Sequence, residues 1–397
     1  MASSPVDNGT LTGKVMCGYQ GWFSCAGDGA KVGWTHWSKE RWKGVKPGLA
    51  NFDLWPDMSE YPPEERFATG FKHADGSAAE LFSSDNAMTV RRHFRWMREY
   101  GIDGAFVQRF PVDFADSVWS RRVDRVLSHC RAGAIAEGRV YAVMYDLTGM
   151  NAGQFETIAK DWAGLRARLE VGVDRTYLKL HGRPLVGIWG VGFSDDRRYS
   201  LADCRRLIEG MRAAGCSVLV GVPTWWRDGK EDATSDPALR EVLRLADVVS
   251  PWSVGRYRTP AEVGRHGAKH WRRDLEWCRE AGVDYLPVVF PGFSWHNLKG
   301  DTFDAIPRRR GEFLWSQFVA AKRSGAEMIY VAMFDEVDES TAIFKCTNHP
   351  PAGDGARFLT YEGLPSDFYL RLTGAGGRLL RGEIDVHDRP PSDLMDR

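Results

Sequence analysis

The sequence predicts an α/β fold, a (β/α)8 or TIM barrel that forms a single domain with loop insertions. Three observations support this prediction. Eight short apolar, β-branched or aromatic runs alternate with amphipathic stretches. Most of these runs are almost continuously apolar, as in parallel strands that are covered on both faces. The chain has 397 residues, which is long enough for eight strand–helix units with extended loops.

The expected strands follow one another along the chain. They lie at Val15–Tyr19, Gly104–Gln108, Val140–Tyr145, Leu185–Trp189, Val218–Val222, Val248–Trp252, Tyr285–Phe290 and Met328–Phe334. Helical spacing of apolar residues predicts helices at Asn86–Tyr100, Ser117–Ala132, Leu201–Ala213, Pro260–Glu280 and Glu312–Arg323. An open, doubly wound sheet is the alternative arrangement for the same series of elements.

One domain accounts for nearly the whole chain. The barrel is expected to span residues 1–375, and no internal repeat is visible beyond the strand–helix alternation. The Gly- and Pro-rich segment that begins at Gly374 indicates an exposed tail, which we place at residues 376–397.

Charge and hydropathy exclude several classes of protein. Lys and Arg together number 53, as do Asp and Glu, so no net charge attracts the chain to nucleic acid or to an anionic membrane. No run reaches the roughly 18 apolar residues of a membrane span, and the opening MASSPVDNGTLTGK lacks the apolar core of a signal peptide. We expect a soluble cytoplasmic protein, or a secreted one if a leader preceded Met1.

The cysteines do not form the pattern of a disulfide scaffold. There are seven, an odd number, and they are scattered along the chain. Free thiols in a reducing compartment are the simpler interpretation, and a local bridge between Cys17 and Cys25 is the alternative.

Polar and aromatic residues gather where the expected strands end. In a (β/α)8 barrel these ends, with the loops that follow, form the ligand site. Indole faces stack on the C–H groups of sugar rings, and the 16 Trp residues fit such a cleft as well as they fit a large core. The candidate substrate-binding residues are Tyr19, Gln20, Trp22, His36, Gln108, Arg109, Tyr145, Asp146, Trp189, Trp225, Trp226, Trp252, Trp295 and His296.

Each of these candidates also has a structural interpretation. Core packing is the alternative for every aromatic residue, and Trp96, Trp277 and Trp315 fall within helical patterns and are assigned to the core. Asp146 could orient an acid or cap a helix. Arg109 could bind a carboxylate or form a structural ion pair.

Glu336 and Glu339 are the strongest candidates for catalysis. Two carboxylates three residues apart on a helix or tight turn lie on one face, about 5 to 6 Å apart at Cβ. At that range one pKa rises, which leaves one group protonated and the other ionised. Glycosidic cleavage needs this pairing, and a short separation favours retention of configuration. Alternatively, the acidic run Asp335–Glu339 begins a solvated helix.

Other chemical signatures fail on spacing. Residues 9–14 read GTLTGK, one residue short of a P-loop, and no HExxH, paired CxxC or GxSxG is present. Cys346 and His349 lack a second pair of zinc ligands. The acidic run could hold a divalent cation, but it lacks the spaced loop with a glycine bend. We expect no metal and no cofactor.

Several motifs resemble glycoside hydrolase family 99 and its family 71-like relatives. They are GYQGWF at residues 18–23, YLKLHGRPLVGIW at residues 177–189, and the last strand leading into EVDE at residues 336–339. The resemblance implies a metal-independent, retaining (β/α)8 enzyme that cleaves α-mannosides within a chain. It also implies that Glu336 deprotonates the sugar 2-hydroxyl, which attacks the anomeric carbon, and that Glu339 is the acid/base.

The sequence departs from the family element WNEWHE. Phe334–Glu339 reads FDEVDE, so Val337 and Asp338 replace the Trp and His between the two glutamates. An α-mannoside is therefore the leading substrate, and other glycosides, such as xylosides or arabinosides, are alternatives. The partner is expected to be an oligosaccharide or polysaccharide. A carbohydrate-binding barrel without catalysis and a lyase or metal-dependent sugar enzyme remain open, and the oligomeric state is unknown.

Overall fold

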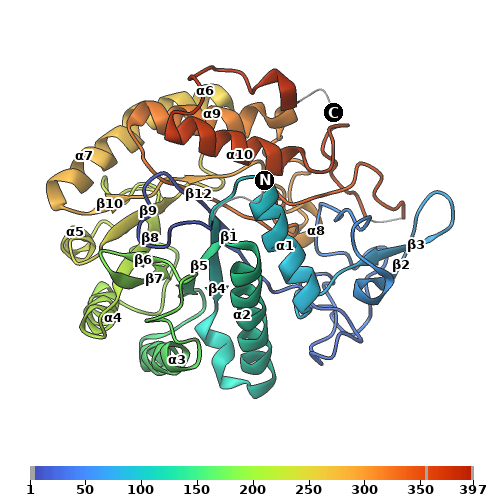
Figure 1. The fold of residues 1–397 in the computed structure, drawn as a ribbon, viewed down its shortest axis with the longest axis horizontal. Helices are drawn as coiled ribbons and strands as arrows, with labels where there is room; N and C mark the ends of the chain where they lie inside the picture. Colours follow the sequence, from blue (N-terminus) through green and yellow to red (C-terminus); the bar gives the residue numbers. More distant parts are fainter. Residues whose placement is uncertain (1–4, 354–355, 395–397) are drawn as a thin grey trace.

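A ring of parallel strands forms the centre of the computed structural model, which describes residues 5–353 and 356–394 (Figure 1). Neighbouring strands follow the order β9 (Val248–Trp252), β8 (Ser217–Pro223), β7 (Arg183–Trp189), β5 (Val140–Asp146), β4 (Gly104–Arg109), β1 (Val15–Tyr19) and β12 (Ile329–Val331). Seven of the eight expected strands therefore lie in this sheet. Strand β12 is shorter than the apolar run Met328–Phe334 that predicted it.

The expected strand Tyr285–Phe290 closes the ring. It is divided into β10 (Asp284–Tyr285), which pairs with β9, and β11 (Val288–Val289), which pairs with β12. Only Leu286 and Pro287 separate the two pieces, so one extended segment joins both edges of the sheet. The described strands thus form a closed parallel barrel. The alternative of an open, doubly wound sheet is wrong.

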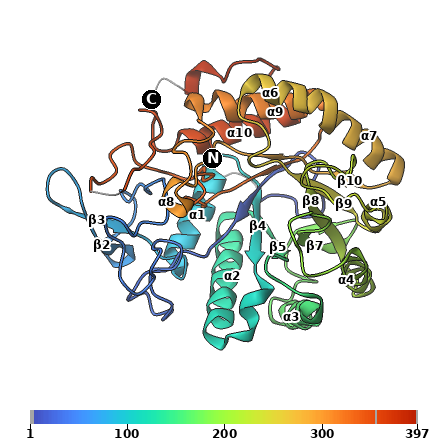
Figure 2. The same cartoon turned by 180° about the vertical axis from the view of Figure 1, so that it is seen from behind.

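Helices surround the strands, and α1 and α2 lie side by side in both views (Figure 2). The expected helices are present as α1 (Ala87–Glu99), α2 (Ser117–Glu137), α4 (Leu201–Ala213), α6 (Pro260–His266), a π-helical turn (Gly267–Trp271), α7 (Arg272–Ala281) and α9 (Glu312–Ser324). Polar N-caps explain several starts, since the side chains of Asn86, Asp116, Ser200 and Thr259 accept the first free backbone N–H groups.

Several elements were not predicted. They are the hairpin β2 (Phe67–Lys72) and β3 (Ala78–Leu81), the short strand β6 (Lys179–Leu180), and helices α3 (Phe155–Arg168), α5 (Ala238–Leu243), α8 (His296–Lys299) and α10 (Phe368–Arg381). Short 3-10 turns occur at Pro63–Glu65, Pro111–Ala115, Ala152–Gln154, Arg309–Gly311 and Ser392–Leu394. The hairpin projects from the barrel (Figure 1), and most of its side chains are at least partly exposed, so it lacks a strong apolar pattern.

The expectation of an exposed tail from Gly374 onward is wrong for its first part. Helix α10 continues to Arg381, and its glycines are buried because other elements approach them closely. A Cβ on Gly374 would lie 1.9 Å from the Tyr100 carbonyl oxygen, and one on Gly376 would lie 2.4 Å from the Phe318 ring. The glycines therefore allow close helix packing. Residues 381–391 are mostly exposed, and residues 395–397 lie outside the described residues.

The cysteines are all buried and free, so the alternative of a bridge between Cys17 and Cys25 is wrong. Among the described residues, no helix combines the length and apolar character that crossing a bilayer requires.

Candidate active site

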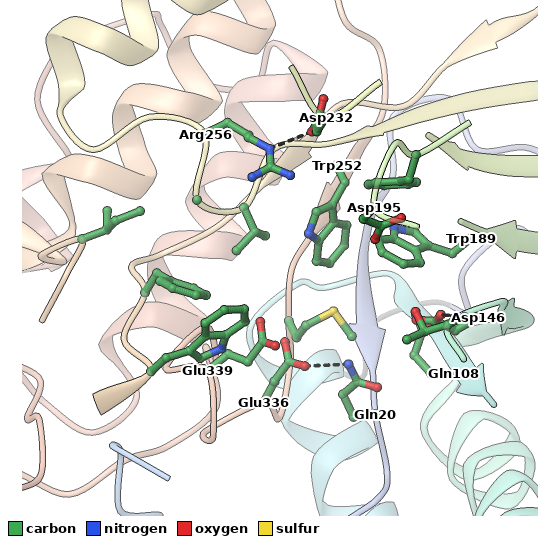
Figure 3. A pocket seen from close by; sticks show the side chains of 18 of the residues that line it. Gln20, Gln108, Asp146, Trp189, Asp195, Asp232, Trp252, Arg256, Glu336 and Glu339 are labelled. Carbon is green, nitrogen blue, oxygen red and sulfur yellow. Dashed lines mark hydrogen bonds and ion pairs between the residues drawn. The ribbon is translucent and has the colours of Figure 1, made fainter. Parts of the chain in front are cut away.

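A cavity of about 840 Å³ lies at the carboxyl ends of the barrel strands (Figure 3). Residues at the ends of several different strands contribute side chains to it, as the barrel prediction requires. The structure brings these predicted residues together around the cavity: Gln20, Trp22, Gln108, Asp146, Trp189, Trp252, Trp295, Glu336 and Glu339.

Glu336 is fixed by two neutral hydrogen-bond donors. The Gln20 side-chain amide donates to one carboxylate oxygen over 2.7 Å, and the Thr341 hydroxyl donates to the other over 2.8 Å. Burial, followed by the nearby Glu339 and Asp338 carboxylates, raises the pKa of Glu336 well above its ordinary value. Within the pair, the donors on Glu336 favour the negative charge on this residue.

Glu339 lies beside Glu336 and reaches the same cavity (Figure 3). Burial, and then the Asp338 carboxylate, raises the pKa of Glu339 to about 8. Two carboxylates in one buried space therefore hold a proton between them at neutral pH. The sequence spacing predicted the proximity of these two carboxylates.

The turn that carries the glutamates is buried rather than solvated. Asp335, Glu336 and Asp338 are each at most 2% exposed, and the next helix, α10, begins only at Phe368. Asp335 accepts hydrogen bonds from the backbone N–H groups of Gln20 and Gly21, over 2.8 and 2.9 Å. The alternative that this acidic run begins a solvated helix is wrong.

Aromatic rings form much of the cavity wall. Trp22 stacks on His36 with 3.9 Å between ring centroids and on Phe110 with 5.5 Å. Trp189 and Trp252 meet edge to face at 5.5 Å. The indole N–H groups of Trp22 and Trp189 are buried and have no partner among the described residues. Both rings line the cavity and also pack against protein groups, Trp22 against His36 and Phe110 and Trp189 against the Arg197 guanidinium.

Two further polar groups of the cavity, Gln108 and Asp146, come from the ends of β4 and β5. Gln108 donates to the Tyr330 hydroxyl over 3.0 Å. Asp146 accepts from the backbone N–H of Thr148 over 2.8 Å, and burial raises the pKa of Asp146. Both residues can exchange hydrogen bonds with sugar hydroxyls.

Three predicted binding residues at strand ends point away from the cavity into the layer of helices. Tyr19 lies within hydrogen-bond distance of His93, at 2.9 Å. Arg109 is fully buried and pairs with Asp161 and Asp124, and Tyr145 donates to the same Asp161. We therefore remove Tyr19, Arg109 and Tyr145 from the candidate site. Their role is structural.

Four other predicted residues also lie outside the cavity lining. Trp226 is buried against Trp277, and Trp225 packs against His270 and the Arg256 guanidinium. His296 bonds to the Asp301 carbonyl. His36 lies behind Trp22, where its ring nitrogen is 2.8 Å from Asp338, so it supports the site without lining it.

Sequence reasoning missed other residues that line the cavity. They include Phe110, Thr148, Phe193, Asp195, Arg197, Asp232, Arg256, Arg258, Tyr330 and Met333. Tyr330 and Met333 lie within the predicted last strand, and Arg256 follows the predicted strand Val248–Trp252 by four residues. The search for site residues stopped close to the end of each expected strand. A search that extended further into each loop would have included Arg197, Arg256 and Arg258. Within residues 5–353 and 356–394, no three His, Cys, Asp or Glu side chains are grouped to hold a metal ion.

Comparison with solved structures identifies similar folds. The chain matches the GH99 endo-alpha-mannosidase from Bacteroides thetaiotaomicron with a TM-score of 0.65 and 17% sequence identity, over 94% of this chain and 99% of that chain. It matches a glycoside hydrolase-like protein with a TM-score of 0.57 and 16% identity, over 94% and 96% of the two chains. No protein-family model and no curated protein sequence matches the chain. The likeness confirms the fold that the sequence motifs implied.

Proposed function

We propose that this protein is a glycoside hydrolase that cleaves α-linked glycans with Glu336 and Glu339. The observation that carries the proposal is the pair of interacting carboxylates in an aromatic-walled cavity at the carboxyl ends of the strands. The likeness in fold to an endo-alpha-mannosidase supports it. A binding protein would need the aromatic walls but has no use for a second carboxylate that shares a proton with the first.

In the proposed mechanism, Glu336 is the base and Glu339 is the acid. Glu336, held by Gln20 and Thr341, removes the proton of the sugar 2-hydroxyl, whose oxygen attacks the anomeric carbon. Glu339 gives its proton to the leaving oxygen as the glycosidic bond breaks. Glu339 then takes a proton from water, whose oxygen attacks the anomeric carbon and opens the resulting 1,2-anhydro sugar, while Glu336 returns its proton to the sugar O2. Two displacements at the anomeric carbon give net retention.

An α-mannoside is the leading substrate. Val337 and Asp338 replace the Trp and His of the family element, but neither side chain lines the cavity of this chain. Specificity therefore depends on the other cavity residues, and xylosides or arabinosides with a suitably placed 2-hydroxyl are the alternative substrates.

Defined α-linked oligosaccharides provide the test. Glu336→Gln and Glu339→Gln should each lower turnover by at least about 10³-fold while sugar binding and the circular dichroism spectrum are unchanged. NMR of the first product should show the retained anomer. A fully active variant would remove that residue from the mechanism, and an inverted product would exclude the mechanism itself. Binding by the wild type without turnover would favour the carbohydrate-binding alternative.

A further inference from the structure

Arg256 lines the cavity, and only part of its guanidinium group is hydrogen-bonded to the protein. It lies in the loop after β9, and its Nε–H donates to Asp232 over 2.8 Å. Asp232 also accepts the backbone N–H groups of Thr224 and Trp225, over 3.2 and 3.3 Å. The aspartate is thus fixed by the loop after β8, and it holds the guanidinium in one orientation.

The outer edge of this guanidinium has no protein acceptor. Neither terminal nitrogen of Arg256 has a hydrogen-bond partner among the described residues, and the group lies across the cavity from Glu336 and Glu339 (Figure 3). Arg258, two residues further on, lines the same cavity and is exposed. Its guanidinium likewise has no acceptor in the described part of the chain.

Arg197 lines the same cavity, but protein acceptors engage each nitrogen of its guanidinium group. Asp195 binds it through both carboxylate oxygens, over 2.6 and 2.9 Å. Its remaining terminal nitrogen donates to Tyr199 and Thr148, over 3.2 and 3.4 Å. The protein therefore satisfies Arg197 with its own acceptors but leaves the donors of Arg256 and Arg258 free.

We propose that Arg256 and Arg258 form a subsite for an anionic substituent, a carboxylate or a sulfate ester, on a sugar unit of the substrate. This inference rests on the proposed function and narrows its substrate class to acidic glycans. The terminal edge of a guanidinium donates two parallel hydrogen bonds, which match two oxygens of a carboxylate or sulfate.

The charges around the subsite are compatible with an anion. Asp232 is engaged by Arg256, and Asp195, also in the cavity, is engaged by Arg197. Glu262 accepts the backbone N–H of Arg258 over 2.6 Å and lies outside the cavity lining. The glutamate pair lies on the other side of the cavity (Figure 3). Gln108 and Asp146 already offer hydrogen-bond partners for neutral sugar hydroxyls in this cavity. Neutral hydroxyls therefore do not account for the two arginines.

Binding measurements with matched monosaccharides test the proposal without requiring turnover. The probes are methyl α-mannoside, its 6-carboxylate (the mannuronate) and its 6-sulfate, and calorimetry measures the dissociation constant of each. At least one anionic probe should bind about tenfold tighter than the neutral one, and added salt should reduce the difference. Comparison of the two anions identifies which substituent the subsite takes.

Variants separate a specific subsite from general charge attraction. Arg256→Met should remove the preference and leave the affinity for methyl α-mannoside within about twofold. Arg258→Met should weaken the preference. Arg265→Met removes an equal charge from an exposed position outside the cavity and should change nothing. Asp232→Asn keeps the Arg256 charge but loosens its orientation, so part of the preference should be lost.

Equal or absent binding of the charged and neutral probes would overturn the subsite, as would an Arg256→Met variant that weakens all three alike. Hydrolysis of neutral α-linked oligosaccharides without any anion preference would reject the subsite and leave the proposed function intact. An anion preference in a protein that hydrolyses no glycan would support the subsite and reject the proposed function.

Discussion

Replacing Glu339 by Gln should increase stability at alkaline pH. Burial and Asp338 raise the pKa of Glu339 from its ordinary 4.5 to about 8, so between these values the folded chain holds a proton that the unfolded chain has released. The stability from this proton is complete below about pH 4.5 and is lost as pH rises to about 8. The difference between these two pKa values corresponds to about 5 kcal/mol of unfolding free energy. Solvent around the half-buried Glu339 side chain reduces this contribution to about 2–3 kcal/mol.

Urea unfolding of the wild type and Glu339→Gln at about pH 5 and about pH 9 measures this effect. The free energy of unfolding of the variant, relative to the wild type, should rise by about 2–3 kcal/mol between the two conditions, because Gln does not titrate. Buried carboxyls that do not interact with Glu339 are common to both proteins and cancel. The pKa of Glu336 falls when the Glu339 charge is removed, which changes the difference in the same direction. Glu64→Gln, at an exposed position, is the control. A constant difference between variant and wild type would refute the reasoning.

Two further predictions concern the surroundings of the glutamate pair. Asp338→Asn removes a charge that raises the pKa of both glutamates, so the alkaline limit of the kcat/KM profile should move down by about one pH unit; an unchanged limit would contradict this. Gly18→Ala places a Cβ 2.2 Å from Met333 and 2.4 Å from the Tyr330 hydroxyl. This substitution should lower the free energy of unfolding by about 1–3 kcal/mol. A calorimetric Tm equal to that of the wild type would contradict this prediction and show that Met333 and Tyr330 can move to accommodate the methyl group.

The proximity of the two glutamates proposed as the catalytic pair could be predicted because its geometry is local. Glu336 and Glu339 are three residues apart, directly after an apolar strand, so neither long-range contacts nor the register of the sheet was needed to bring them together. The ring of strands was also predictable, since each strand is buried on both faces and reads as a continuous apolar run.

The same continuity explains why three residues at strand ends, Tyr19, Arg109 and Tyr145, were misplaced. Successive side chains of a strand point to opposite faces, and a uniformly apolar strand does not reveal which face is inside. At the end of β4, Gln108 points into the cavity and Arg109 points toward the helices. At the end of β5, Asp146 points inward and Tyr145 outward, where it meets Asp161.

Loop residues could not be predicted for a different reason. Asp232 and Arg256 come from the loops after β8 and β9, and they meet only because those strands are neighbours in the ring. The sequence holds both residues but carries no signal for a pair across two irregular loops. The arginines were therefore missed, although they decide the charge on one side of the cavity.

Closure of the barrel also sets the electrostatics of the active site. Strands β1 and β12, the first and last of the ring, pair side by side. This contact brings Gln20 to Glu336 across 316 positions of sequence, and it brings the backbone N–H groups of Gln20 and Gly21 to Asp335. Without the Gln20 amide, Glu336 would lose one of the two donors that favour its ionised form. The distribution of the proton between the two glutamates therefore depends on the junction of the two ends of the barrel, as well as on the three-residue spacing that first indicated them.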